Sequence, residues 1–76
     1  MFCQWLEQQS NSIGMSIEEI LDRADINFNL YRNWKKGKGI NTPTIIKITK
    51  EISKHSKKTY RELILEAVLS EKDRTT

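Results

Sequence analysis

The sequence predicts a compact all-α domain of five helices. Apolar residues recur every three or four positions in five successive segments, and residues that start or stop helices separate these segments. The 76-residue chain has one proline, three glycines and no long alternating pattern typical of strands. This length fits one domain, residues 1–70, followed by a charged tail, residues 71–76.

The first helix is predicted over residues 1–12. Phe2, Trp5 and Leu6 are spaced i, i+3 and i+4, so they share one side of a helix and are expected to enter the core. Gly14 is expected to end this helix, because glycine readily adopts the left-handed conformation that follows a helix C-terminus.

Residues 16–37 predict two helices joined by a tight turn. The spacing of Ser16 and Glu19 is that of a capping box at a helix start. Asp25 is one of the few residue types that tolerate the positive φ of a sharp turn, and Asn27 can cap the next helix. The buried stripe of the first helix of this pair is expected to contain Ile17, Ile20, Leu21 and Ala24.

The second helix of the pair, residues 27–36, is the expected working surface. Its core-facing side chains are predicted to be Ile26, Leu30, Tyr31 and Trp34. Its outward positions carry groups that hydrogen-bond base edges or phosphates: Asn29, Arg32, Asn33 and Lys36. Gly37 is expected to follow its C-terminus.

The last two helices are predicted from a proline and a second capping box. Thr42 is expected to cap a helix whose first residue is Pro43 and whose buried stripe contains Ile45, Ile48 and Ile52. Thr59 and Glu62 open a final helix over residues 60–70. The apolar arc of that helix is wider than one core contact needs.

Charge is unevenly distributed along the chain. Residues 1–31 carry five acidic and one basic side chain, whereas residues 32–61 carry ten basic and one acidic. A basic block that starts on the expected working helix is typical of a protein that binds a polyanion. The alternative is a solvated lysine-rich surface, which this segregation makes the weaker interpretation.

Several strings in this region resemble the phage-repressor and Cro-like helix-turn-helix family, also called the XRE family. They are S-I-E-E-I-L from Ser16, the turn A-D-I-N, and N-L-Y-R-N-W-K-K-G-K from Asn29. The resemblance spans roughly residues 16–52. It implies a lambda-repressor-like fold and a small, repressor-like transcriptional regulator that binds double-stranded DNA, with helix 27–36 in the major groove.

The chain departs from the family pattern at three positions. Ile17 stands where a phosphate-binding polar residue is common, and Leu21 where alanine allows close helix packing. Asp25 stands where the turn usually has glycine. Ile17 therefore removes one expected phosphate contact.

The expected DNA contacts fall into two groups. Base-reading residues are predicted to be Phe28, Asn29, Arg32 and Asn33. Phosphate-binding residues are predicted to be Ser16, Asn27, Lys35, Lys36 and Lys38. Phe28 is unusual at a position that repressors give to a polar base reader: it fits either a thymine methyl or a protein-binding surface.

Partners beyond DNA are also suggested by the sequence. Leu65 and Leu69 lie i, i+4 apart on the last helix, beside its core-facing stripe, and are expected to form a homodimer interface. The rival function is a protein-interaction module of the same fold, which would bind a regulator or toxin through Phe28 and the last helix instead of DNA.

Other function classes lack a sequence signal. No nucleophile–base pair, phosphate-cradling glycine loop, cofactor motif or Cys/His cluster with metal spacing is present, so neither an enzyme nor a metal site is expected. No apolar run is long enough for a membrane span, and no signal peptide is visible. The protein is expected to be bacterial or phage-encoded and to act in the cytoplasm, near the nucleoid.

Overall fold

The computed structural model describes residues 2–73, including the side chains of residues 2–70, and contains five helices. No strand occurs within this range, so the predicted five-helix all-α fold is confirmed. In chain order the helices are α1 (Phe2–Ile13), α2 (Ile17–Arg23), α3 (Phe28–Lys35), α4 (Thr42–Ser53) and α5 (Tyr60–Asp73).

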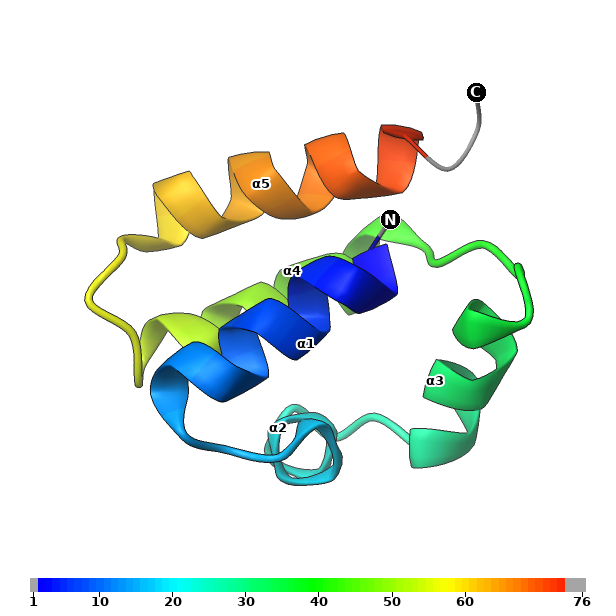
Figure 1. Cartoon of the computed structure of the whole chain (residues 1–76), viewed down its shortest axis with the longest axis horizontal. Helices are drawn as coiled ribbons and strands as arrows, with labels where there is room; N and C mark the ends of the chain where they lie inside the picture. The colour runs from blue at the N-terminus through cyan, green and yellow to red at the C-terminus, as the bar shows by residue number, and fades with distance from the viewer. Residues whose placement is uncertain (1, 74–76) are drawn as a thin grey trace.

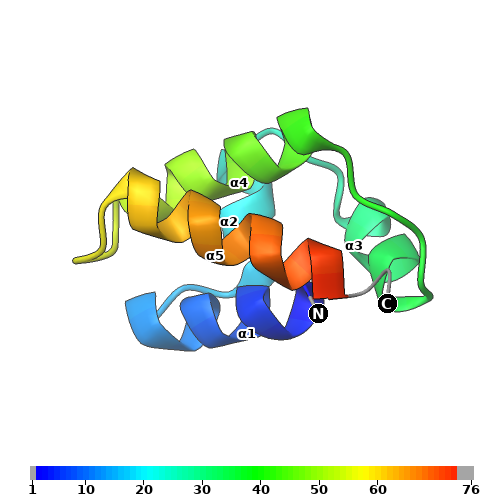
Figure 2. The same cartoon turned by 90° about the horizontal axis from the view of Figure 1, so that it is seen from above.

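The helices are arranged around α1 and α4, which lie in the middle of the molecule (Figure 1). Helix α5 runs along one side of both, and α2 crosses on the opposite side. Seen from above, α5 lies between α1 and α4, and α3 stands at one end (Figure 2). Because α3 contacts only α1 and α2 extensively, much of its surface remains open to solvent.

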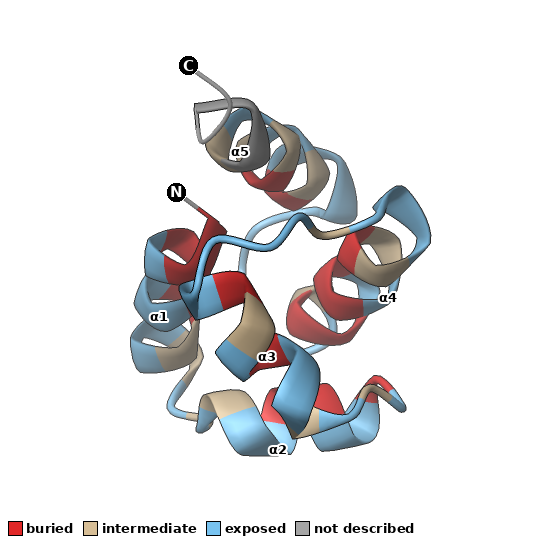
Figure 3. Cartoon of the chain, turned by 90° about the vertical axis from the view of Figure 1, so that its right-hand side faces the viewer, coloured by how far each residue is buried: buried red, intermediate tan, exposed pale blue. Residues whose placement is uncertain are grey.

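The core is formed by apolar side chains from all five helices. Figure 3 shows that the buried residues of α1 and α4 lie on the sides that face the interior. The largest fully buried side chains belong to Phe2, Leu6, Ile20, Leu21, Ile48, Ile52 and Leu63. Burial of such apolar side chains is the largest favourable contribution to folding in a small domain.

The start of α2 and the turn between α2 and α3 have the predicted geometry. The N–H of Glu19 donates to Ser16 Oγ at 3.1 Å, which is one of the two bonds of the predicted capping box. Asp25 adopts a φ of 61°, in the left-handed region. The N–H of Asn29 then donates to Asn27 Oδ1 at 2.8 Å, so Asn27 caps α3 as expected.

Two local predictions are wrong. Asn41, not Thr42, caps α4, because its side-chain Oδ1 accepts a hydrogen bond from the N–H of Thr44 at 2.9 Å. Thr42 and Pro43 therefore lie inside the first turn. Leu30 is 41% exposed instead of facing the core, since Tyr31 and Trp34 define the buried side of α3 and Leu30 lies on its flank.

Helix α5 extends beyond its predicted end. It continues to Asp73, so the backbone of residues 71–73, predicted as part of a tail, is helical. Met1 and residues 74–76, which belong to the predicted first helix and tail, lie outside the described residues.

Candidate nucleic-acid interface

Two buried aromatic side chains fix the position of α3. Trp34 is 6% exposed, and its ring meets that of Phe2 edge-on with centroids 6.1 Å apart. The Tyr31 hydroxyl donates to Glu7 Oε1 at 3.1 Å, which ties α3 to α1. Burial and this hydrogen bond raise the pKa of Tyr31 above its ordinary value, so the hydroxyl stays protonated and keeps its donor role.

The opposite side of α3 carries polar and cationic groups. Asn29, Arg32 and Lys36 are exposed on it, and Asn33 is half-buried. These are three of the four predicted base-reading residues and one of the predicted phosphate-binding lysines. The ridge presents amide and guanidinium groups, which are the groups that hydrogen-bond base edges in a major groove.

Two further lysines flank the same ridge. Lys35 is exposed, and its Nζ lies 5.5 Å from the centroid of the Tyr31 ring. The backbone N–H of Lys38 donates to the carbonyl of Asn33 at 3.1 Å, so the loop after α3 folds back on the helix. The structure therefore groups Lys35, Lys36 and Lys38 near the C-terminal end of α3.

Phe28, the fourth predicted base-reading residue, is half-buried. Its ring packs against the core, with its centroid 5.5 Å from that of Tyr31. The guanidinium carbon of Arg32 lies over the ring, 5.7 Å from its centroid. Phe28 is thus less accessible than Asn29 or Arg32.

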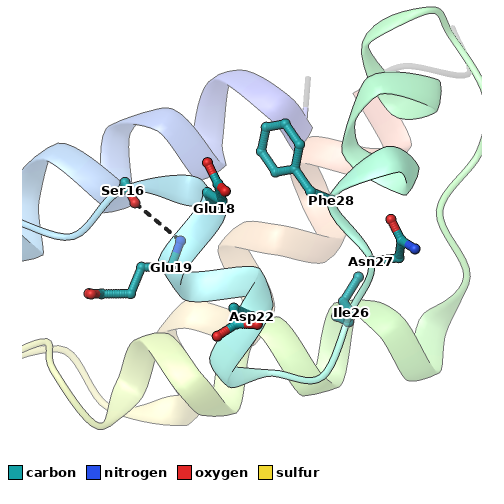
Figure 4. Close-up of a pocket in the computed structure, with 7 residues that line it drawn as sticks. All are labelled: Ser16, Glu18, Glu19, Asp22, Ile26, Asn27 and Phe28. Carbon is teal, nitrogen blue, oxygen red and sulfur yellow. Dashed lines mark hydrogen bonds between the residues drawn. The ribbon is translucent and has the colours of Figure 1, made fainter.

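The remaining predicted phosphate contacts have an acidic environment. Ser16 and Asn27 use their side-chain oxygens to cap α2 and α3. Both also line a hollow between these helices, together with Phe28, Ile26 and three carboxylate side chains (Figure 4). The carboxylates are those of Glu18, Glu19 and Asp22.

This acidic rim was missed by sequence reasoning, although its signal was present. Glu18 and Asp22 are spaced i, i+4, which places them on one side of a helix directly before the turn. Negative charge there opposes a phosphate beside Ser16 or Asn27. The cationic side chains Arg32, Lys35 and Lys36 are instead concentrated in the C-terminal half of α3 and at its C-cap.

The predicted dimer residues are exposed on α5. Leu65 and Leu69 are each 60% exposed, whereas Leu63 and Ala67 on the same helix are fully buried. Helix α5 therefore has one apolar side in the core and a second, smaller apolar strip toward solvent.

Two other kinds of feature, a metal site and a membrane span, were not found in the described part of the chain. Within residues 2–70 no group of three or more His, Cys, Asp or Glu side chains is arranged to hold a metal ion. None of the five helices combines the length and apolar character that a membrane span requires. No protein-family model, curated protein sequence or solved structure matches the chain.

Proposed function

We propose that this protein binds double-stranded DNA as a small, repressor-like transcriptional regulator, with α3 in the major groove. The observation that carries the proposal is the exposed ridge of Asn29, Arg32 and Lys36 on a helix whose other side is buried. A helix held in this way can enter a groove without losing its packing. The resemblance of residues 16–52 to the XRE family points to the same function.

Each group on the ridge has a chemical role in this proposal. The planar fork of Arg32 pairs with guanine O6 and N7, and the amides of Asn29 and Asn33 pair with adenine N6 and N7. Lys35, Lys36 and Lys38 contact phosphates on either side of the groove. The acidic hollow makes Ser16 and Asn27 the weaker phosphate contacts.

Two copies of the chain would bind together. One recognition helix reads only a few base pairs, whereas a two-fold dimer places two such helices in successive major grooves about 34 Å apart. The exposed pair Leu65 and Leu69 on α5 is the proposed contact between copies. Helix α5 lies on the side of the molecule away from α2, so this contact leaves the α2–α3 surface open (Figure 1).

A salt titration tests DNA binding. Affinity for a mixed-sequence duplex, followed by fluorescence anisotropy, should fall with a log–log slope of about −0.9 for each phosphate neutralised. The paired change Lys36→Gln with Lys38→Gln should make this slope shallower by about 2 per chain. Absent or salt-independent binding would contradict the proposal.

A matched control removes the same charge elsewhere. Lys57→Gln with Arg61→Gln acts on the α4–α5 connection and the start of α5, at the opposite end of the molecule from α3 (Figures 1 and 2). This control should leave the slope near that of the wild type. Equal losses from both pairs would mean that net charge alone, not the α3 ridge, attracts DNA.

A second candidate function is favoured by the acidic hollow. The half-buried Phe28 and Ile26, surrounded by carboxylates, would suit a protein partner with apolar and cationic side chains. In that case the protein is an interaction module, and the duplex titration shows no binding at low salt.

A further inference from the structure

Two aromatic rings on α3 each lie beneath a cationic side chain one turn later. The Arg32 guanidinium carbon is 5.7 Å from the centroid of the Phe28 ring, and Lys35 Nζ is 5.5 Å from that of Tyr31. Both pairs are spaced i, i+4, the separation at which helix side chains meet. Both distances fall within the range of a cation–π contact.

The Phe28 ring is itself held in place. It is half-buried against the core, and its neighbour Tyr31 is only 5% exposed and hydrogen-bonded to Glu7. These contacts restrict how the ring can reorient. It offers Arg32 a fixed surface at the N-terminal end of the exposed ridge.

Arg32 has no competing partner among the described side chains. No carboxylate of residues 2–70 forms an ion pair with it, although three acidic side chains line the nearby hollow. A guanidinium is planar and weakly hydrated, so it can stack on a ring while its N–H edge remains available to a second group. The contact with the Phe28 ring limits the orientations of Arg32 before any ligand arrives.

We propose that Phe28 is a positioning residue for Arg32, and not a base reader. The ring holds the guanidinium so that its N–H edge meets the O6 and N7 of one guanine. This inference rests on the proposed DNA-binding function and deepens it, because it assigns the side chain that orients Arg32 toward its guanine. Lys35 over Tyr31 is the contrasting case: an ammonium has no planar edge, so that contact cannot orient a fork toward a base.

A simpler alternative is that Phe28 only fills the edge of the core. Under that explanation, replacing Phe28 lowers stability and reduces binding to all sequences alike. Under the positioning role, the replacement specifically weakens the preference for guanine. The ratio of affinities for two duplexes separates the two, because the folded fraction of each variant cancels in the ratio.

The experiment begins with a duplex selected by the wild-type protein from a random pool. Each guanine of that site is then replaced in turn by 7-deazaguanine, which lacks the N7 acceptor. The wild type should lose about 5- to 150-fold in affinity at the guanine that Arg32 contacts. Phe28→Leu should reduce this loss by about two- to fivefold, whereas Phe28→Tyr, which keeps the ring, should retain it.

A second variant ties the effect to Arg32. Arg32→Lys removes the planar fork, so Phe28→Leu should not change the 7-deazaguanine ratio further in that background. An unchanged ratio in Phe28→Leu alone, or an equal effect in the Arg32→Lys background, would overturn the positioning role and leave DNA binding intact. A selected site with no guanine whose N7 matters also overturns it. Failure of the wild type to bind any duplex overturns the proposed function as well.

Discussion

The indole N–H of Trp5 donates a 2.9 Å hydrogen bond to Oε1 of Glu66, joining α1 to α5. The second carboxylate oxygen, Oε2, accepts from Lys58 Nζ, also at 2.9 Å. The hydrogen bond from Trp5 lowers the pKa of Glu66, and Lys58 lowers it further against the opposing effect of burial. This carboxylate therefore ties α5, the helix that carries the proposed dimer contact, to α1.

Glu66→Gln should destabilise the protein by about 1 kcal/mol at neutral pH, because the charge-assisted bonds from Trp5 and Lys58 weaken. Since the folded-state pKa lies below the ordinary value of 4.5, the carboxylate stabilises the fold above that pH and loses this effect as pH falls through the lower folded-state pKa. Urea unfolding at about pH 7 and about pH 3 measures both effects. Glu18→Gln, an exposed control, should leave the free energy of unfolding at about pH 7 unchanged. A Glu66→Gln protein with wild-type acid sensitivity would contradict this account.

Trp34→Ala should destabilise the domain by about 3–5 kcal/mol, because the ring is 6% exposed and packs on Phe2. A loss of this size is enough to unfold most molecules of so small a domain. Circular dichroism during thermal unfolding measures it, with Leu30→Ala as a control on the exposed flank of the same helix. A normally folded Trp34→Ala protein that has only lost DNA binding would show that the ring contacts DNA instead.

Arg32→Ala should relax sequence preference at one or two base pairs and cost about 1–3 kcal/mol on the selected site. Lys36→Ala and Lys38→Ala should instead weaken binding to all sequences alike, because phosphates carry no sequence information. Affinities for a selected site and for single-base variants of it measure the difference. Arg61→Ala, at the far end of the molecule, controls for the lost charge. A uniform loss in Arg32→Ala would make Arg32 a phosphate contact.

Leu65→Ser combined with Leu69→Ser should give a folded monomer with weaker DNA binding. Both side chains are 60% exposed, so their replacement costs little in the core but removes the proposed contact between copies. Sedimentation at protein concentrations on the order of tens of micromolar should show a dimer for the wild type and a monomer for the variant. Tyr60→Ser, which alters another exposed apolar residue of α5, should remain dimeric. A monomeric wild type that binds one site without cooperativity would refute dimerisation.

Much of the fold was predictable because its signals are local. The cap at Asn27, the left-handed Asp25 and the burial of Tyr31 and Trp34 each follow from residue type and helical spacing. The exposure of Leu30 was not predictable in this way. Periodicity places a residue near the buried side of a helix, but the neighbouring helices decide how wide that side is.

Contacts between segments far apart in the chain were not predictable. Nothing local distinguishes Glu66, which receives the indole of Trp5, from an ordinary surface glutamate. Glu51 is a different case: its partners Lys54 and His55 are only three and four residues away, but its burial to 7% exposed was not predictable from this local spacing. Burial tends to raise its pKa, but hydrogen bonds from His55 and Lys54 produce a net lowering. The partial burial of Phe28 beneath Arg32 likewise depends on how α3 rests against the core.

The most direct test of the central claim is the position of bound DNA on the protein. Amide chemical shifts of isotopically labelled protein, followed by NMR while a mixed-sequence duplex is added, map that position residue by residue. The account predicts that the largest shifts fall on residues 29–38, with smaller shifts around the acidic hollow and none along the exposed strip of α5. Shifts centred on Glu18 and Asp22 or on α5 while α3 stays unchanged, or no shifts at all, would contradict it.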